Sequence, residues 1–310
     1  MDLNFKEKLK EIKNLEIREK QPLKKISSFK IGGPADIFLI PHSCSSLQEV
    51  ISLLSRNKLP FFIMGKATNL IISDRGIREI VIYTGELKNI SIKGNRISAE
   101  AGISLPSLAA RALEAGLSGL EFASGIPGSL GGALYMNAGA YGHEMKDIVE
   151  RVYTLNYSGQ EQILDNKKLG FSYRYSILQE KKLIATRTEL LLKPGNYSII
   201  KKKMAELNNK RREKQPLEYS SVGSIFKRPK QHYSGPLIEK AGMKGASIGD
   251  ARVSTKHAGF IINAGKATAV EVLALIKRVR EEVYKTSGIW LELEPKLIGD
   301  FKDETILHLT

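Results

Sequence analysis

The sequence of 310 residues contains a single cysteine, Cys44. One cysteine can form no disulfide within the chain and cannot build a cysteine-based zinc site. The five histidines are scattered without the spacing of metal ligands, so no metal site is predicted. So little cysteine is typical of a reducing compartment, and we expect the protein to be cytoplasmic.

Features of exported and membrane proteins are also missing. The first 30 residues are rich in Lys and Glu without an apolar core, unlike a signal peptide. Phe122–Tyr141 is uncharged over the length of a membrane span, but it contains Pro127 and five glycines. At roughly 1 kcal/mol for each glycine and roughly 3 kcal/mol for the proline, a helix there would be unstable. We therefore predict a buried glycine-rich loop system and no membrane anchor.

Positive charge is in excess, because 48 Lys and Arg against 33 Asp and Glu give a net charge of +15. This balance indicates a polyanionic partner, either a nucleic acid or a phosphate-bearing small molecule, with charge for solubility as the alternative. Residues 199–244 hold 12 basic and 4 acidic side chains, about half of the excess. A nucleic-acid surface would interleave basic with aromatic residues. Residues 199–218 contain no aromatic residue, and the first one, Tyr219, lies just beyond their end. No nucleic-acid partner is therefore expected.

Hydrophobic periodicity predicts a mixture of helices and strands. Ser46 with Glu49 and Thr268 with Glu271 have the spacing of capping boxes, which begin helices. The predicted helices are 3–15, 46–57, 104–115, 199–214 and the segment from 268 to about 288. The predicted strands are 36–40, 61–64, 70–72, 80–83, 90–92, 96–100, 151–156, 183–192 and 289–298.

Turn residues group these elements into three mixed units. Pro194-Gly195 marks one boundary, and a shift from strand–helix–strand to short strands marks the other. The predicted domains are 1–85, 86–195 and 200–310. The chain is therefore predicted to belong to the α+β class.

Several common motifs are absent or matched only formally. No G-x-G-x-x-G and no G-x-x-x-x-G-K-[ST] occurs, so Rossmann and P-loop sites have no support. Gly245–Gly249 matches the G-x-S-x-G nucleophile elbow, which needs a strand before it and a helix after it. Residues 250–253 read as a strand instead, and the nearby His257 has no obvious acid to orient it. A hydrolase is therefore disfavoured.

Two glycine-containing segments could cradle phosphates. Gly125–Gly132 is the densest one, and Gly65–Asn69 is the second. Glycine lets the backbone approach a ligand and adopt positive φ, and successive N–H groups can then hold an anion. Two such loops in separate units suggest a large dinucleotide between them, held by backbone dipoles because no basic side chain lies near Gly128 in sequence. Tight turns without a ligand are the alternative.

The glycine run and four other blocks closely resemble the MurB family of UDP-N-acetylenolpyruvoylglucosamine reductases. These are flavin enzymes of peptidoglycan precursor synthesis. The resemblance extends from about residue 27 to 300, and the length suggests the shorter variant of the family. Its blocks are Ser28–Ala35, Ser124–Ala133 with Met136–Gly142, Phe171–Ser176, Gly223–Pro229 and Lys256–Asn263.

The resemblance implies a fold like that of vanillyl-alcohol oxidase, in which two α+β subdomains hold FAD and a C-terminal domain covers the substrate. It also implies NADPH as co-substrate. One turn of the family usually reads Gly-x-Gly-Ser-Asn. In this chain the turn is Gly65–Asn69, with Ala67 in place of the second glycine and Thr68 in place of the serine. A positive φ at Ala67 would cost roughly 1 kcal/mol. The implied flavin contacts are Ile31, Gly32, Gly33, Gly65, Lys66, Ala67, Thr68, Asn69, Gly125, Ile126, Pro127, Gly128, Ser129, Gly131 and Gly132.

The implied reaction is reduction of UDP-N-acetylglucosamine enolpyruvate to UDP-N-acetylmuramate. The resemblance assigns the proton donor to Ser224, and we expect Lys227 to support its alkoxide and to bind substrate. Arg174 would bind the substrate carboxylate bidentately, and Tyr173 beside it is predicted to bind substrate as well.

The acidic partner would be Glu294, and Glu292 remains its rival because both would share one strand face. Pro295 departs from the family's usual Val and would remove a strand N–H. The basic segment 199–244 would steer the anionic UDP-sugar and NADPH. Another FAD-dependent oxidase or dehydrogenase of the same fold is the second hypothesis.

Overall fold

The computed structural model describes residues 3–301, and its internal contacts divide the chain into two compact units. Unit 1 comprises Met1–Arg18, Phe38–Lys66 and Ile80–Arg211. Unit 2 comprises Glu19–Ile37, Ala67–Glu79 and Arg212–Thr310. These units describe packing, and the division into three domains stays a prediction.

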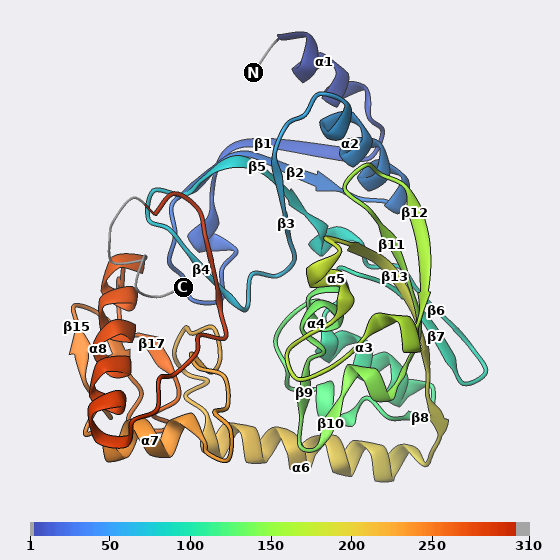
Figure 1. The fold of residues 1–310 in the computed structure, drawn as a ribbon. Helices are drawn as coiled ribbons and strands as arrows, with labels where there is room; N and C mark the ends of the chain where they lie inside the picture. The colour runs from blue at the N-terminus through green and yellow to red at the C-terminus, as the bar shows by residue number, and fades with distance from the viewer. Residues whose placement is uncertain (1–2, 302–310) are drawn as a thin grey trace. The chain divides into compact units, whose positions relative to one another are not determined.

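Unit 1 contains a five-stranded sheet in the order β12-β11-β13-β7-β6, and every neighbouring pair is antiparallel. Figure 1 shows its helices α3, α4 and α5 beside this sheet. Apolar side chains from the sheet and from α3 and α4 form one core, which includes Ile97, Leu108, Leu134 and Val152. The elements are β6 (Ile90–Lys93), β7 (Arg96–Glu100), α3 (Leu105–Glu114), α4 (Leu130–Met136), β11 (Val149–Leu155), β12 (Glu161–Asp165), α5 (Ile177–Glu180) and β13 (Ile184–Leu191).

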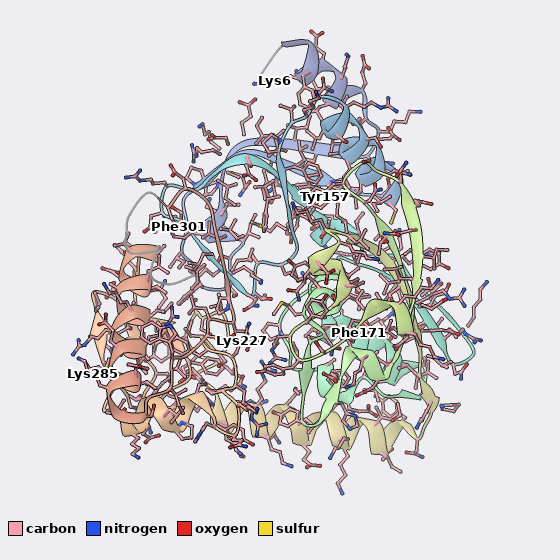
Figure 2. The ribbon with its side chains drawn as sticks, in the orientation of Figure 1. Lys6, Tyr157, Phe171, Lys227, Lys285 and Phe301 are labelled. Atoms are coloured by element: carbon pink, nitrogen blue, oxygen red, sulfur yellow. The ribbon has the colours of Figure 1, made fainter. Side chains whose placement is uncertain are left out.

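A second sheet has the order β1-β2-β5-β3, and the chain passes between the two units within β1, β2 and β5. Strands β3 and β5 run parallel, and α2 precedes β3 with four apolar side chains buried. Tyr157, labelled in Figure 2, stacks on Phe61 of β3 with the ring centres 4.7 Å apart. The elements are α1 (Leu3–Glu11), β1 (Leu15–Pro22), β2 (Pro34–Pro41), α2 (Cys44–Arg56), β3 (Phe61–Met64) and β5 (Ile77–Tyr83).

In unit 2, α8 packs against a three-stranded antiparallel sheet, β15-β16-β17, and α7 packs against α8 (Figure 1). Thr268 and Glu271 form the capping box of α8, and Gly288 ends that helix with φ of +70°. Strands β4 and β18 pair in parallel, so Leu70–Ile72 lies beside the C-terminal segment. The elements are β4 (Leu70–Ile72), α7 (Ser234–Lys240), β15 (Ser247–Ile248), β16 (Ala251–Val253), β17 (Ile261–Asn263), α8 (Ala269–Ser287) and β18 (Lys296–Ile298).

The remaining elements are short, except for the helix α6. The long basic helix predicted at 199–214 is confirmed as α6, Tyr197–Lys214. The short strands are β8 (Leu117–Ser118) with β14 (Lys193–Pro194) and β9 (Gly139–Ala140) with β10 (His143–Glu144). In the described part of the chain, 3-10 turns lie at Leu23–Lys25, Thr84–Glu86, Glu121–Ala123, Met145–Asp147 and Asn166–Leu169. Within residues 3–301, no helix has both the length and the apolar character to cross a membrane.

Three local predictions are corrected. The cap of α2 is Ser43, whose hydroxyl accepts from the N–H of Ser46, so the helix begins before the predicted Ser46. The segment 289–298 is a strand only at Lys296–Ile298. Within the predicted loop system 122–141, residues Leu130–Met136 form the helix α4 despite two glycines.

Candidate active site

The N-terminal amides of α4, at the end of the glycine-rich loop, are already hydrogen-bonded within the protein. The N–H of Leu130 donates to Ile103 O at 2.8 Å, and that of Gly131 donates to Ala101 O at 2.7 Å. The N–H of Gly132 donates to the hydroxyl of Ser129 at 3.4 Å. The start of this helix therefore offers no donors to an anion.

The donors that remain lie one step earlier in the loop. Within residues 3–301, the amides of Gly128 and Ser129 have no hydrogen-bond acceptor. Gly128 has φ of +139°, which only glycine adopts without strain. A Cβ on Gly65 would lie 2.5 Å from Ser129 Oγ, so the Gly65-Lys66 turn packs closely against this part of the loop. Two of the predicted flavin segments thus meet in unit 1.

The half-buried side chain of Arg211 lies beside the same loop, and the sequence did not predict it. A Cβ on Gly125 would lie 3.2 Å from Arg211 Cδ, which comes from the helix α6. Among the described residues, Arg211 Nε is buried without a hydrogen-bond partner. Burial lowers the pKa of Arg211. A cation that is partly removed from water is costly unless an anion binds to it.

Arg174 lies at the tip of a tight turn. Ser172 and Tyr175 close the turn with two backbone hydrogen bonds of 3.1 Å each. Arg174 has φ of +57°, a left-handed conformation that is strained for a side chain of this size. Its guanidinium carbon lies 5.0 Å from the ring centre of Tyr173, which is 51% exposed. The turn therefore presents a cation and an aromatic ring together.

In unit 2, the glycines of Ile31–Gly33 have a packing explanation. A Cβ on Gly32 would lie 2.7 Å from Ile72 Cβ. One on Gly33 would lie 2.2 Å from the carbonyl oxygen of Asp74. Close contact between 31–33 and 72–76 requires both glycines, and their contact with a flavin stays a prediction.

The second half of the predicted phosphate turn joins the C-terminal segment. Ala67 has φ of +49°, and its carbonyl accepts from the N–H of Ser28 at 3.3 Å. The carbonyl of Asn69 accepts from the N–H of Lys296 at 3.0 Å. The amide group of Asn69 donates to Glu294 O at 3.4 Å. Thr68 lies half-buried between them.

The segments that carry Ser224 and Glu294 run antiparallel beside each other. The N–H of Glu294 donates to Ile225 O at 3.0 Å, and that of Lys227 donates to Glu292 O at 2.9 Å. The hydroxyl of Ser224 donates to Phe226 O at 3.1 Å. Two of the three predicted catalytic residues are thus brought together within unit 2.

Lys227 and Glu292 pair with each other. Lys227, labelled in Figure 2, lies 3.2 Å from the Glu292 carboxylate, whose side chain is 72% exposed. Glu294 on the same segment is half-buried. An exposed ion pair of this kind contributes little to stability. The exposure of Glu292 favours Glu294 as the acid in a site that excludes water.

His257 lies beside Ser224, although no role in this site was predicted for it. A Cβ on Gly259 would lie 3.0 Å from His257 Cε1 and 3.6 Å from Ser224 Oγ. His257 Nδ1 accepts from the N–H of Gly259 at 3.1 Å, which leaves Nε2 to carry the proton in the neutral ring. Burial lowers the pKa of His257.

Three other candidates for a functional site, a serine nucleophile, the cysteine thiol and a metal cluster, find no support in the structure. Ser247 of the G-x-S-x-G match lies on β15 and is followed by the strand β16, as predicted, so the elbow geometry is absent there. Burial and the nearby Glu100 raise the pKa of Cys44 to about 12, so this thiol stays protonated. Among the described residues, no cluster of His, Cys, Asp or Glu could hold a metal.

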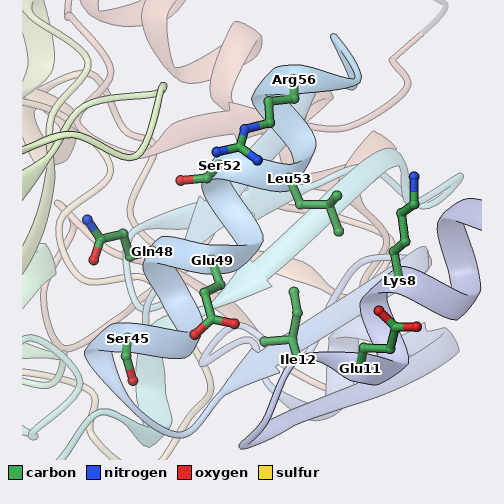
Figure 3. A pocket seen from close by; sticks show the side chains of 9 residues that line it. All are labelled: Lys8, Glu11, Ile12, Ser45, Gln48, Glu49, Ser52, Leu53 and Arg56. Atoms are coloured by element: carbon green, nitrogen blue, oxygen red, sulfur yellow. The ribbon is translucent and has the colours of Figure 1, made fainter.

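An open hollow of about 670 Å³ lies between α1 and α2 (Figure 3). Its lining mixes both signs of charge, with Lys8 and Arg56 against Glu11 and Glu49. None of the predicted site residues lines it.

The chain matches two known protein families in succession. Residues 35–165 match an FAD binding domain. Residues 215–298 match the family described as UDP-N-acetylenolpyruvoylglucosamine reductase, C-terminal domain. The predicted α+β fold, with an FAD-binding part followed by a C-terminal domain, is confirmed.

Whole-length relatives carry the same description. UDP-N-acetylenolpyruvoylglucosamine reductase from Caldanaerobacter subterraneus is 52% identical over 295 residues, which cover 95% of this chain and 98% of the relative. That from Alkaliphilus oremlandii is 46% identical over 281 residues, which cover 90% and 92%. The crystal structure of the reductase from Thermus caldophilus superposes with a TM-score of 0.79 at 36% identity, covering 91% of this chain and 98% of that one.

Proposed function

Because the chain belongs to the family of UDP-N-acetylenolpyruvoylglucosamine reductases, we propose that it reduces UDP-N-acetylglucosamine enolpyruvate to UDP-N-acetylmuramate, with FAD as cofactor and NADPH as reductant. This step belongs to peptidoglycan precursor synthesis, and we place it in the cytoplasm. Both substrates are anions, and the net charge of +15 favours their encounter with the protein.

FAD fits the loop in unit 1. Its pyrophosphate would accept hydrogen bonds from the amides of Gly128 and Ser129 and pair with the half-buried Arg211. The remaining flavin contacts stay as the sequence predicts them, from Ile31 to Gly132. The chemistry that FAD supplies when bound is hydride transfer, from NADPH to the terminal vinyl carbon of the enolpyruvyl ether.

Arg174 would bind the substrate carboxylate. Negative charge develops on the carbon next to this carboxylate as hydride adds to the vinyl carbon, and it spreads onto the carboxylate oxygens. A guanidinium fork fits both oxygens and holds the increasing charge. The exposed ring of Tyr173 beside it would contact the sugar-linked part of the substrate.

Ser224 would complete the reaction by protonating that carbon. The Oγ–H bond breaks as the new C–H bond forms, and the resulting alkoxide recovers its proton from water. A serine hydroxyl is a weak acid, so its alkoxide needs support. The Nε2–H of the neutral His257 and the ammonium of Lys227 are on the same unit, and Glu294 is the acid on the adjacent segment.

The observation that carries these roles is the antiparallel pairing of the Ser224 and Glu294 segments. The test is Ser224→Ala, with reduction of the flavin by NADPH and its reoxidation by the enolpyruvyl sugar measured separately by stopped flow. We expect reduction to be unchanged and reoxidation to be slower by about 10²–10⁴-fold. Ser220→Ala on the same segment is the matched control. Equal loss of both half-reactions would contradict the proton-donor role.

A further inference from the structure

The turn that carries Arg174 is held by side chains outside it. The amide group of Gln179, on α5, donates to Arg174 O at 2.9 Å and to Tyr135 O at 2.8 Å. Its two donors thus link the strained residue to the last turn of α4. Ser176 adds a third bond, from its hydroxyl to the same Tyr135 oxygen at 2.9 Å.

Asn137 holds the other side of the turn. Its side chain is fully buried, and its amide donates to Ser172 O at 3.1 Å and to a Glu144 carboxylate oxygen at 2.9 Å. Its own oxygen accepts from the N–H of Lys146 at 3.0 Å. Asn137 ends α4 with φ of +42°, a conformation that asparagine tolerates better than most residues.

Both contacts are tied to the C-terminal end of the same short helix, α4, because Gln179 of α5 donates to its Tyr135 carbonyl and Asn137 ends it. Helix α4 begins directly after Gly128-Ser129 and ends at Met136, so it spans about 10 Å at 1.5 Å per residue. Its first residue directly follows the Gly128-Ser129 loop. At its other end Asn137 holds Ser172 O, and Gln179 of α5 links its Tyr135 carbonyl to Arg174 O. A rigid connection of this kind sets where the guanidinium lies relative to the loop.

We propose that Gln179 and Asn137 are positioning residues, which hold Arg174 in its left-handed conformation so that its guanidinium meets the substrate carboxylate. The proposal rests on the proposed function of Arg174. Without the bond from Gln179, the turn loses the hydrogen bond that Arg174 O itself accepts from α5, and the unfavourable φ at Arg174 is less well compensated. The arginine then has to be reordered each time substrate binds.

The experiment is a double-mutant cycle on the FAD-loaded enzyme with Gln179→Met, Arg174→Met and the double variant. Gln179→Met keeps the side-chain length and removes both donors. We expect the enolpyruvyl sugar to bind about five- to tenfold more weakly in the flavin reoxidation step. This is the factor for losing one hydrogen bond, here the bond to Arg174 O. Flavin reduction by NADPH should be unchanged. In the Arg174→Met background, Gln179→Met should cause no further loss.

Gln162→Met, on the exposed face of β12, is the matched control and should behave as the unaltered enzyme. An equal loss from Gln179→Met with and without Arg174 would mean a general structural role and would overturn the proposal, as would no loss at all. If Arg174→Met itself leaves sugar binding unchanged, the proposed role of Arg174 is wrong. The positioning role of Gln179 and Asn137 is then wrong as well. The cycle thus separates the two failures.

Discussion

Replacing Ala67 by glycine measures the strain that this chain carries where its family has glycine. Ala67 adopts φ of +49°, and its side chain is 4% exposed. The matched control is Ala109→Gly in α3, where alanine is 1% exposed and has ordinary helical geometry. Both changes remove one buried methyl group, and only the first removes a left-handed alanine.

The two changes should differ clearly in free energy of unfolding. At Ala67, loss of the methyl costs about 0.8 kcal/mol, and the freedom of glycine in the unfolded chain costs about 0.4–1 kcal/mol. Relief of the left-handed conformation offsets about 1–2 kcal/mol of this, so the net change is near zero. At Ala109, the methyl and the poor helix propensity of glycine together cost about 2 kcal/mol.

Thermal unfolding of the two variants at fixed FAD concentration checks this reasoning. With about 2–4 °C of Tm per kcal/mol, Ala109→Gly should lose about 4–8 °C and Ala67→Gly less than about 2 °C. The quantity compared is the difference in Tm change between the two variants. The effect of losing a buried methyl group is common to both variants and cancels. An equal drop for both would refute the claim that Ala67 is strained.

The remaining predictions concern the cofactor cation and the choice of acid. Arg211→Met, which keeps the alkyl stem and removes the charge, should weaken FAD binding by about 10–100-fold in a flavin fluorescence titration. Arg212→Met, at the neighbouring exposed position, should change it by less than about twofold; similar losses would show that only general charge matters. Glu294→Gln should lower kcat/KM far more than Glu292→Gln, because Glu292 is exposed and paired with Lys227. The opposite ranking would mean that the catalytic register is shifted by two residues.

Elements with strong local signals could be predicted from the sequence. The capping box of Thr268 with Glu271 and the glycine at 288 bound α8, and the structure places both as predicted. The strand 96–100 also agrees with β7. In each case the signal lies within a few residues of the feature, so no knowledge of distant contacts is needed.

Predictions failed where nearby residues competed for one role or where pairing was long-range. Ser43 and Ser46 can both cap α2, and the hydrophobic pattern does not distinguish them. Pro295 cannot donate to a ladder, and the segment before it makes only isolated contacts with 225–227, so a continuous strand does not form. Three strands of the five-stranded sheet, β11, β12 and β13, lie between Gly125 and Arg211 in sequence, and no local pattern links the two residues.

A glycine-rich sequence is therefore not by itself a sign of a ligand. Gly32 and Gly33 are required because another part of the backbone comes too close for a side chain. The amide of Gly131 is already used by a carbonyl of the protein. The amide of Gly128 has no acceptor among the described residues, and the half-buried Arg211 lies beside the same loop with its Nε buried and unpaired among those residues. Because donors and cations that are removed from water need partners, these two together favour an anion, which the glycine count alone does not.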